Sequence, residues 1–279
     1  MRGHNLSVRR DLDALVTELS TGEAADIPKR LRGDFSGLAA VESGLTRLQA
    51  FATVQVEAGN FAGAMQTALG AVQDSVADTG PKLMASVKPG EDRLLSATLA
   101  EAAQRFDAIV GQLNSRNGDR SLFAGNAVDR PALAPAEDIL AALSTAVAGL
   151  TTAEDVRIAV DAWFDTPAGG FETVGYLGSA DPLNPFKISD TAEAKLDLLA
   201  SDDELRNEVK EFSIAALLDD GLLGGDLGER QRLAEDAGLG MINAERELIA
   251  ARSRVCTEEA HIETTVVRIA AERNSLLMA

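Results

Sequence analysis

The C-terminal stretch Met241–Ala279 reads MINAERELIAARSRVCTEEAHIETTVVRIAAERNSLLMA and contains no glycine, proline, phenylalanine, tyrosine or tryptophan. Apolar side chains recur in it at intervals of seven residues, the heptad spacing of helices that pack side by side. The row consists of Met241, Leu248, Val255, Ile262, Ile269 and Leu276. At 1.5 Å per residue, the stretch predicts a helix about 58 Å long. So slender a helix is marginal alone and needs partners that cover its apolar row.

Polar residues narrow the apolar row of this helix. Arg252 and Glu259 stand where a two-stranded coiled coil carries its second apolar residue. A shorter neighbouring row is formed by Ile242, Ile249 and Cys256. The spacing leaves two partners open for the main row: the N-terminal helices of the same chain, or other copies of the chain.

The beginning of the chain predicts a helix of the same kind. Leu12, Leu15 and Leu19 are spaced by three and four residues, which places them on one helix face. A second helix is expected after Asp34, whose side chain can cap it, and a third helix ends near Leu113. We predict that two sets of residues form assembly seams. They are Leu12, Leu15 and Leu19 near the N-terminus and Met241, Leu248, Val255, Ile262, Ile269 and Leu276 near the C-terminus.

The middle of the chain differs from both ends, because residues 114–190 hold five of the eight prolines. Prolines interrupt long helices, so this part predicts short elements. The expected elements are helices over 136–149, 153–163 and 192–219 and strands over 171–177 and 185–189. The predicted fold class is mainly α: a long antiparallel helical rod from paired N- and C-terminal helices, with a small α+β central domain.

The charge of the chain is concentrated in this middle part. The 279 residues have a formal net charge of −18, and residues 137–240 alone carry 22 acidic and 7 basic side chains, a net charge of −15. Residues 1–32, 33–136 and 241–279 carry +1, −3 and −1. A protein that binds nucleic-acid phosphates needs a basic stripe, so that class is excluded. Near-neutral ends can pack against copies of themselves without strong repulsion.

Residues suited to chemistry are few. One cysteine and two histidines exclude an internal disulfide and leave too few ligands for a Cys/His metal site. Glu258 and His261 have the spacing of half a carboxylate di-metal site, but the other half is absent. Cys256 and His261 point to different sides of a helix, so they do not form a nucleophile–base pair. The sequence predicts no enzyme, no metal and no cofactor.

No stretch of the sequence is apolar enough to span a bilayer, so no membrane partner is expected. The basic N-terminus is not followed by the apolar segment of a cleavable secretory signal.

Two short motifs accompany the heptad helix. The first is Leu19-Ser20-Thr21-Gly22, which follows the first predicted helix. The second is the loop 117–126, which contains Leu122, Phe123 and Gly125. Together with the heptad helix and in this order, they resemble the flagellin superfamily, and within it the branch that sits at the hook–filament junction. The Tyr176–Gly178 step resembles the same branch.

This resemblance implies a structural protein of the bacterial flagellum. In the family, paired terminal helices polymerise into a tube and the middle of the chain faces outward. The implied segments are 1–32 for export and polymerisation, 33–113 for the N-terminal helical rod, 114–236 for the central acidic domain and 237–279 for the C-terminal polymerisation helix. The implied partners are other copies in a ring or tube, another hook-associated protein, flagellin, and the type III export apparatus with its chaperone. The implied location is secreted, at the hook–filament junction.

Two other interpretations stay open. The chain can be the filament flagellin itself, or a cytosolic coiled-coil adaptor with no flagellar role. The family also carries more residues before the Leu-Ser-Thr-Gly motif than this chain does. We therefore expect that the start at Met1 is internal or that the chain is truncated.

Overall fold

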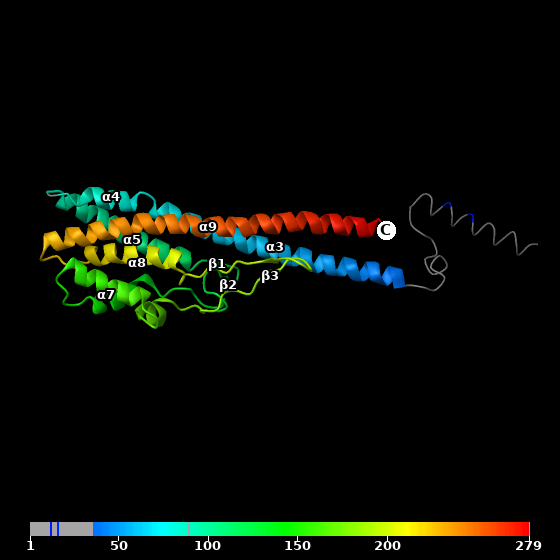
Figure 1. Ribbon diagram of the computed structural model, residues 1–279, viewed down its shortest axis with the longest axis horizontal. Coiled ribbons are helices and arrows are strands. Elements are labelled where there is room, and N and C mark those ends of the chain that lie inside the picture. Colours follow the sequence, from blue (N-terminus) through cyan, green and yellow to red (C-terminus); the bar gives the residue numbers. More distant parts are fainter. Residues whose placement is uncertain (1–11, 13–15, 17–35, 89, 279) are drawn as a thin grey trace, which may run out of the picture. The chain divides into compact units, whose positions relative to one another are not determined.

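The computed structural model describes Leu12, Val16 and residues 36–88 and 90–278. These residues are mainly helical, with two short strand pairs, which confirms the predicted fold class (Figure 1). The helices are α3 (Ser36–Val76), α4 (Thr79–Ser86), α5 (Asp92–Leu113), α6 (Ala136–Ala146), α7 (Ala153–Asp165), the π-helix η1 (Phe171–Gly175), α8 (Asp203–Asp219) and α9 (Leu227–Leu277). The strands are β1 (Arg116–Asn117), β2 (Arg120–Ser121), β3 (Phe186–Lys187) and β4 (Glu193–Ala194).

The chain divides into two compact units, and both α3 and α9 run through the two. One unit takes its residues from Met1–Ala50 and Ala270–Ala279. In this unit α3 passes close to the end of α9, since a Cβ atom added at Gly44 would lie 3.1 Å from Leu276 Cδ1. The other unit, Phe51–Ile269, holds the remaining elements and the large hydrophobic core.

Within Phe51–Ile269, α3 and α9 lie side by side and run antiparallel. Gln66 Nε2 of α3 donates a hydrogen bond to the backbone carbonyl of Arg252 in α9, at 2.9 Å. The Arg252 guanidinium donates to the side-chain oxygen of Gln73. A half-buried arginine needs acceptors for its N–H groups. Gln73 provides one, and Gln66 provides another, since Arg252 Nε also donates to Gln66 Oε1 at 3.4 Å. This pairing explains why a polar residue interrupts the apolar row of α9.

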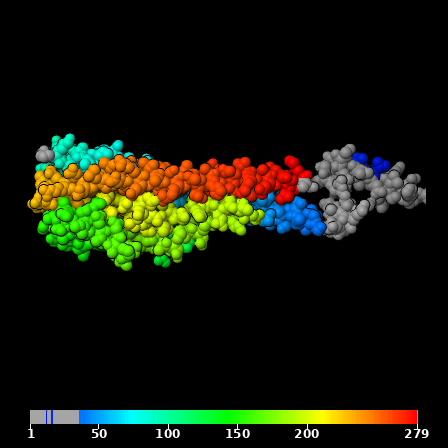
Figure 2. All heavy atoms as spheres, in the orientation of Figure 1, coloured from blue at the N-terminus to red at the C-terminus, as the bar shows by residue number. Residues whose placement is uncertain are grey.

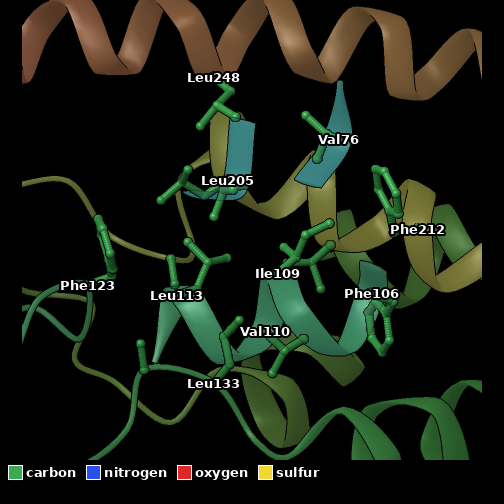
Figure 3. Packing of buried hydrophobic residues seen from close by; sticks show 14 of the residues in the cluster. Val76, Phe106, Ile109, Val110, Leu113, Phe123, Leu133, Leu205, Phe212 and Leu248 are labelled. Atoms are coloured by element: carbon green, nitrogen blue, oxygen red, sulfur yellow. The ribbon is translucent and has the colours of Figure 1, made fainter. Parts of the chain in front are cut away.

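Helix α8 is buried nearly all the way round and lies between α7 and α9 (Figure 1). On one side it packs against α5, and together they form the centre of the core. Figure 3 shows this packing. The residues that meet there include Phe106, Ile109 and Leu113 of α5, Leu205 and Phe212 of α8, Val76 of α3 and Leu248 of α9.

The predicted helix over 192–219 is wrong in its first third. The helix begins only at Asp203. Before it, strand β4 is followed by non-helical chain over 195–199 and a turn over 200–202. Ala194, Leu196 and Leu198 are buried, while Lys195 and Asp197 between them are exposed. This alternation has the period of a strand, so burying one face of the segment requires an extended backbone.

The predicted strand over 171–177 is also wrong, because residues 171–175 form the π-helix η1. Local hydrogen bonds wind this segment: the backbone N–H of Ala168 donates to Glu172 Oε2 at 2.7 Å, and Thr173 Oγ1 donates to the Gly169 carbonyl at 2.8 Å. The turn places Phe171 against Phe164, with ring centroids 5.2 Å apart. Only the next residue, Tyr176, makes a β-bridge, with Leu133.

The other short elements of the middle part agree with the sequence. Helices α6 and α7 occupy the two expected positions, and β3 lies within the expected strand 185–189. Strand β3 pairs antiparallel with β4, and β1 pairs antiparallel with β2. Helix α9 begins at Leu227, ten residues before the expected start of the C-terminal helix at 237. None of the described helices is both long and apolar enough to cross a membrane.

Candidate assembly surface

The heptad row of α9 is covered within the chain itself. Met241, Leu248, Val255, Ile262 and Ile269 are each at most 5% exposed, and Leu276 is half-buried. Four of them, from Met241 to Ile262, belong to the hydrophobic core of the second unit. The first five therefore stabilise the fold of the single chain. A polar substitution at Ile262 would destabilise this fold, so its effect on assembly could not be separated from its effect on folding.

The predicted N-terminal seam and the first motif fall mostly outside the described residues. Leu12 is described, and 55% of its surface is exposed. Leu15, Leu19, Ser20, Thr21 and Gly22 lie outside the described part of the chain. The expected packing of the N-terminal row against the C-terminal row stays a prediction.

The second motif forms a buried loop after the β1–β2 hairpin. Leu122 and Phe123 belong to the hydrophobic core, and the carbonyl of Phe123 accepts a hydrogen bond from the backbone N–H of Ala200 at 3.0 Å. Gly125 has a positive φ of 60° and lies against the backbone of Ser179 and Asp181. These motif residues hold the middle of the chain together, and their side chains are not part of an exposed surface.

Arg120, which opens this loop, joins the middle of the chain to α3. Its guanidinium lies 5.5 Å from the ring centroid of Phe61 in α3 and 5.6 Å from that of Phe186 in β3. It also forms an ion pair with Glu57 of α3. A guanidinium between two aromatic rings gains from both, since each ring face is negative.

We expect Arg120→Met to destabilise the chain by about 1–2 kcal/mol, because the apolar contact remains but both ring interactions and the ion pair are lost. The measurement is the free energy of unfolding from urea denaturation. Arg116→Met is the matched control: Arg116 lies on the same hairpin, but its hydrogen bonds to described residues go to the backbone carbonyls of Asp119 and Asp129. Equal losses in the two variants would contradict this role of Arg120.

A second connection is made by the segment around the β3–β4 hairpin, of which the sequence analysis predicted strand β3 but not strand β4. Gln55 Nε2, buried in α3, donates to the Ile188 carbonyl at 2.8 Å. From α9, Glu258 Oε2 accepts from the backbone N–H of Lys195 at 3.0 Å, and Arg268 donates to Ser189 Oγ at 3.1 Å. The signal was available in the alternating pattern after Glu193, which marks a strand with one buried face.

Helices α7 and α8 are joined by charged side chains, of which Lys210 and Glu211 of α8 are buried. Arg157 of α7 makes two hydrogen bonds of 2.7 Å to the carboxylate of Glu211, which is 3% exposed. Lys210 Nζ lies 2.8 Å from Asp165 and 3.4 Å from Asp161. Burial raises the pKa of Glu211, and the pairing with Arg157 opposes that rise.

Glu208, one turn before, has no such partner. It is fully buried on α8, and neither of its carboxylate oxygens has a hydrogen-bond partner among the residues that the structure describes. Burial, together with the negative charges of the nearby Glu245, Glu211 and Glu247, raises its pKa to about 8. Its position in a run of charged residues, DELRNEVKE over 203–211, gave no sign of this burial.

The exposed side of α9 carries several apolar side chains among its polar ones, in contrast to the buried heptad row. Ile249 is 47% exposed, Val267 is 71% exposed, and Cys256 between them is exposed. Figure 2 shows α9, in orange to red, uncovered along one side. Between α9 and α3 lies a shallow groove of about 470 Å³. It is lined by Gln66, Gln73, Ile249, Arg252, Ser253, Cys256 and Glu259.

The residues that the structure describes contain no group of three histidine, cysteine, aspartate or glutamate side chains placed to hold a metal ion. Glu258, which has metal-site spacing with His261, accepts a hydrogen bond from the backbone N–H of Lys195. Its side chain therefore holds the β3–β4 hairpin against α9.

This geometry defines a class of mainly α proteins with two long antiparallel helices, one early and one late in the sequence. The residues between these helices in the sequence form a smaller α+β part. No family model and no curated protein matches the sequence. Among solved structures, the chain is similar to FlgL from Bacillus cereus, with a TM-score of 0.62 and 14% identity over 87% of this chain and 100% of that one. At this identity the likeness shows a shared fold.

A provisionally assigned flagellar hook-associated protein from Vibrio parahaemolyticus is also similar. It matches with a TM-score of 0.49 and 10% identity over 88% of this chain and 99% of that one.

Proposed function

We propose that this chain is an exported structural protein of the bacterial flagellum, of the hook-associated protein 3 type, which joins the hook to the flagellin filament. The observation that carries the proposal is the likeness to Bacillus cereus FlgL, which spans 87% of this chain and all of that structure. The resemblance of loop 117–126 to the junction branch supports it independently, because that loop was selected from the sequence alone.

The charge distribution is consistent with this role. Long helices with almost neutral ends pack laterally, so copies of the chain form a ring or tube through α3 and α9. The middle part, with its net charge of −15 over residues 137–240, stays in water. The partners are then other copies, a further hook-associated protein and flagellin, and on the way out the export apparatus and its chaperone. The location is outside the cell, at the hook–filament junction.

We expect an in-frame deletion of the gene to leave hooks that carry no filaments, with unassembled flagellin in the culture medium. Electron microscopy of the cells and fractionation of the medium measure this, and re-expression of the wild-type chain is the control. If the deletion strain instead makes hooks and secretes a separate junction protein, but makes no filament subunit, the deleted chain is flagellin. A chain that stays in the cytosol while filaments form normally would support the coiled-coil adaptor and refute the proposal.

A further inference from the structure

Helices α8 and α9 run antiparallel and are in contact along one side of each. Glu204, near the start of α8, forms an ion pair of 2.7 Å with Arg254 of α9. Glu211, seven residues later on α8, lies against the earlier Gly240 of α9, where an added Cβ atom would clash with the Glu211 carboxylate. Because Gly240 has no side chain, α9 can pass close to this buried carboxylate.

Glu208 lies between these two contacts. Its spacings from Glu204 and Glu211 are four and three residues, so all three side chains share one face of α8. Arg157 of α7 donates two hydrogen bonds to the Glu211 carboxylate, but among the described residues Glu208 has no such donor, although it is fully buried. A buried carboxyl group without a partner favours its neutral form, because ionisation would leave an uncompensated charge.

The charged groups that act on Glu208 are acidic. They are Glu245 and Glu247 on α9 and the neighbouring Glu211 on α8. Glu247 is held toward α8 by Asn207, whose Nδ2 donates to Glu247 Oε2 at 2.8 Å. Ionisation of Glu208 therefore brings its charge against carboxylates of the helix on which it packs, and like charges repel.

The cations of the neighbouring elements have other partners. Lys210 of α8 forms ion pairs with Asp161 and Asp165 of α7. On α5, Arg105 bonds to Glu101 and to the last carbonyls of α3, and the other charged side chains of α5 and α6 are exposed. Within the described part of the chain, no basic side chain is placed to neutralise Glu208.

We propose that Glu208 makes the contact between α8 and α9 dependent on pH. The two helices stay packed around a neutral carboxyl group, and they separate there more often once this group is ionised. The opposite side of α8 stays on α5, because Leu205 and Phe212 belong to the apolar core. This inference is independent of the proposed function, since it concerns only contacts within one chain.

The direction of the effect follows from the two states of the contact. With the helices packed, burial and the nearby carboxylates raise the pKa of Glu208 to about 8. With the helices apart, water reaches the side chain, and its pKa returns toward the ordinary value of 4.5. The packed state holds the proton more tightly, so opening becomes more frequent as the pH rises from 4.5 toward 8 and levels off above 8.

Hydrogen–deuterium exchange of the full chain tests this contact. After correction for the intrinsic pH dependence of exchange, we expect the protection of amides in α8 and in residues 240–251 to fall at least about 10-fold between about pH 6 and about pH 9. Glu208→Gln should retain its protection, whereas Glu235→Gln, at an exposed position of α9, should behave as the wild type. At the higher pH the same amides should exchange faster than those of α5, which open only with the whole core.

A cysteine reporter gives a second readout. Ala244 is buried and follows Gly240 by one turn on the same face of α9, so it faces α8. In a Cys256→Ser chain with Ala244→Cys, alkylation by a maleimide should rise with pH more steeply than in the same chain with Glu208→Gln. The ratio of the two rates removes the pH dependence of the thiol itself. Ala102→Cys, buried on α5, should react more slowly than Ala244→Cys at the higher pH.

Three outcomes would overturn the proposal. The first is protection of the wild type that does not change between the two pH values, and the second is an equal fall in the wild type and in Glu208→Gln. The third is equal exchange of α5 and α8 at the higher pH, because the chain would then open only as a whole. The flagellar role is tested separately by the deletion strain, so its failure and the failure of this inference are distinguishable.

Discussion

Replacing Glu208 with glutamine is expected to stabilise the folded chain by about 3–5 kcal/mol above pH 8 and to change its stability little below pH 4.5. The reason is the environment of this side chain on α8. It is fully buried, and within the described part of the chain its two carboxylate oxygens have no hydrogen-bond partners. Its pKa is raised to about 8 from an ordinary value of 4.5.

The direction of the pH dependence follows from proton binding. Because the pKa of Glu208 is higher in the folded state, the folded chain holds this proton more tightly than the unfolded chain does. The resulting contribution to stability is fully present below pH 4.5 and is lost as the pH rises through 8. Glutamine has nearly the same volume and no proton to lose, so it removes this dependence.

The measurement is the free energy of unfolding from chemical denaturation at about pH 5 and about pH 9, for the wild type and for Glu208→Gln. Glu235→Gln is the control, because it removes one negative charge from an exposed position on α9. The expected difference between Glu208→Gln and the wild type is large only at the higher pH. Equal shifts at both pH values, or equal effects of the two substitutions, would show that Glu208 is not buried in this way.

Gly125→Ala is expected to destabilise the chain by about 3 kcal/mol or more. Gly125 has a φ of 60°, a conformation that strains residues with a side chain. In addition, its Cβ position lies against the backbone carbonyls of Asp181 and Ser179, the latter 2.8 Å away. Backbone atoms cannot rotate aside as a flexible side chain can, so the loop that carries the motif would have to move away from residues 179–181.

Gly118→Ala separates the two causes. Gly118 lies in the β1–β2 turn with nearly the same φ of 59°, but a Cβ atom there would meet nothing within 4 Å. We expect Gly118→Ala to lower the free energy of unfolding by only about 1 kcal/mol, because only the strain of the backbone conformation contributes. Urea denaturation gives both values. Similar losses in the two variants would mean that the approach of residues 179–181 contributes nothing at Gly125.

The helices of this chain were predictable because their signals are local. Heptad and 3-4 spacings, with proline and glycine at the breaks, placed α5, α6, α7 and most of α9 close to where they lie. The errors occurred where a local pattern was ambiguous. Residues 192–202 contain good helix formers, yet their alternation of buried and exposed side chains required a strand-like path. In residues 171–175 the backbone was wound by hydrogen bonds to Gly169 and Glu172.

The candidate surface could not be predicted to the same extent. Periodicity shows that a helix has an apolar row, but it carries no information about which molecule covers that row. Both rows of α9 were visible in the sequence, and the longer one was the natural candidate for assembly. The structure covers that row from within the chain and leaves the shorter row at Ile249 and Cys256 exposed.

The sequence by itself determined the helical class, the acidic middle with almost neutral ends, and the absence of the residues that a disulfide or a Cys/His metal site requires. These properties depend on composition and on spacing along the chain. The tertiary structure alone decided that Glu208 is buried without a partner, that Arg120 lies between Phe61 and Phe186, and which face of α9 meets water. Each of these depends on elements more than thirty residues apart in the sequence. Whether a side chain is buried depends on the other elements that pack against its segment, and the pattern of the segment itself does not specify them.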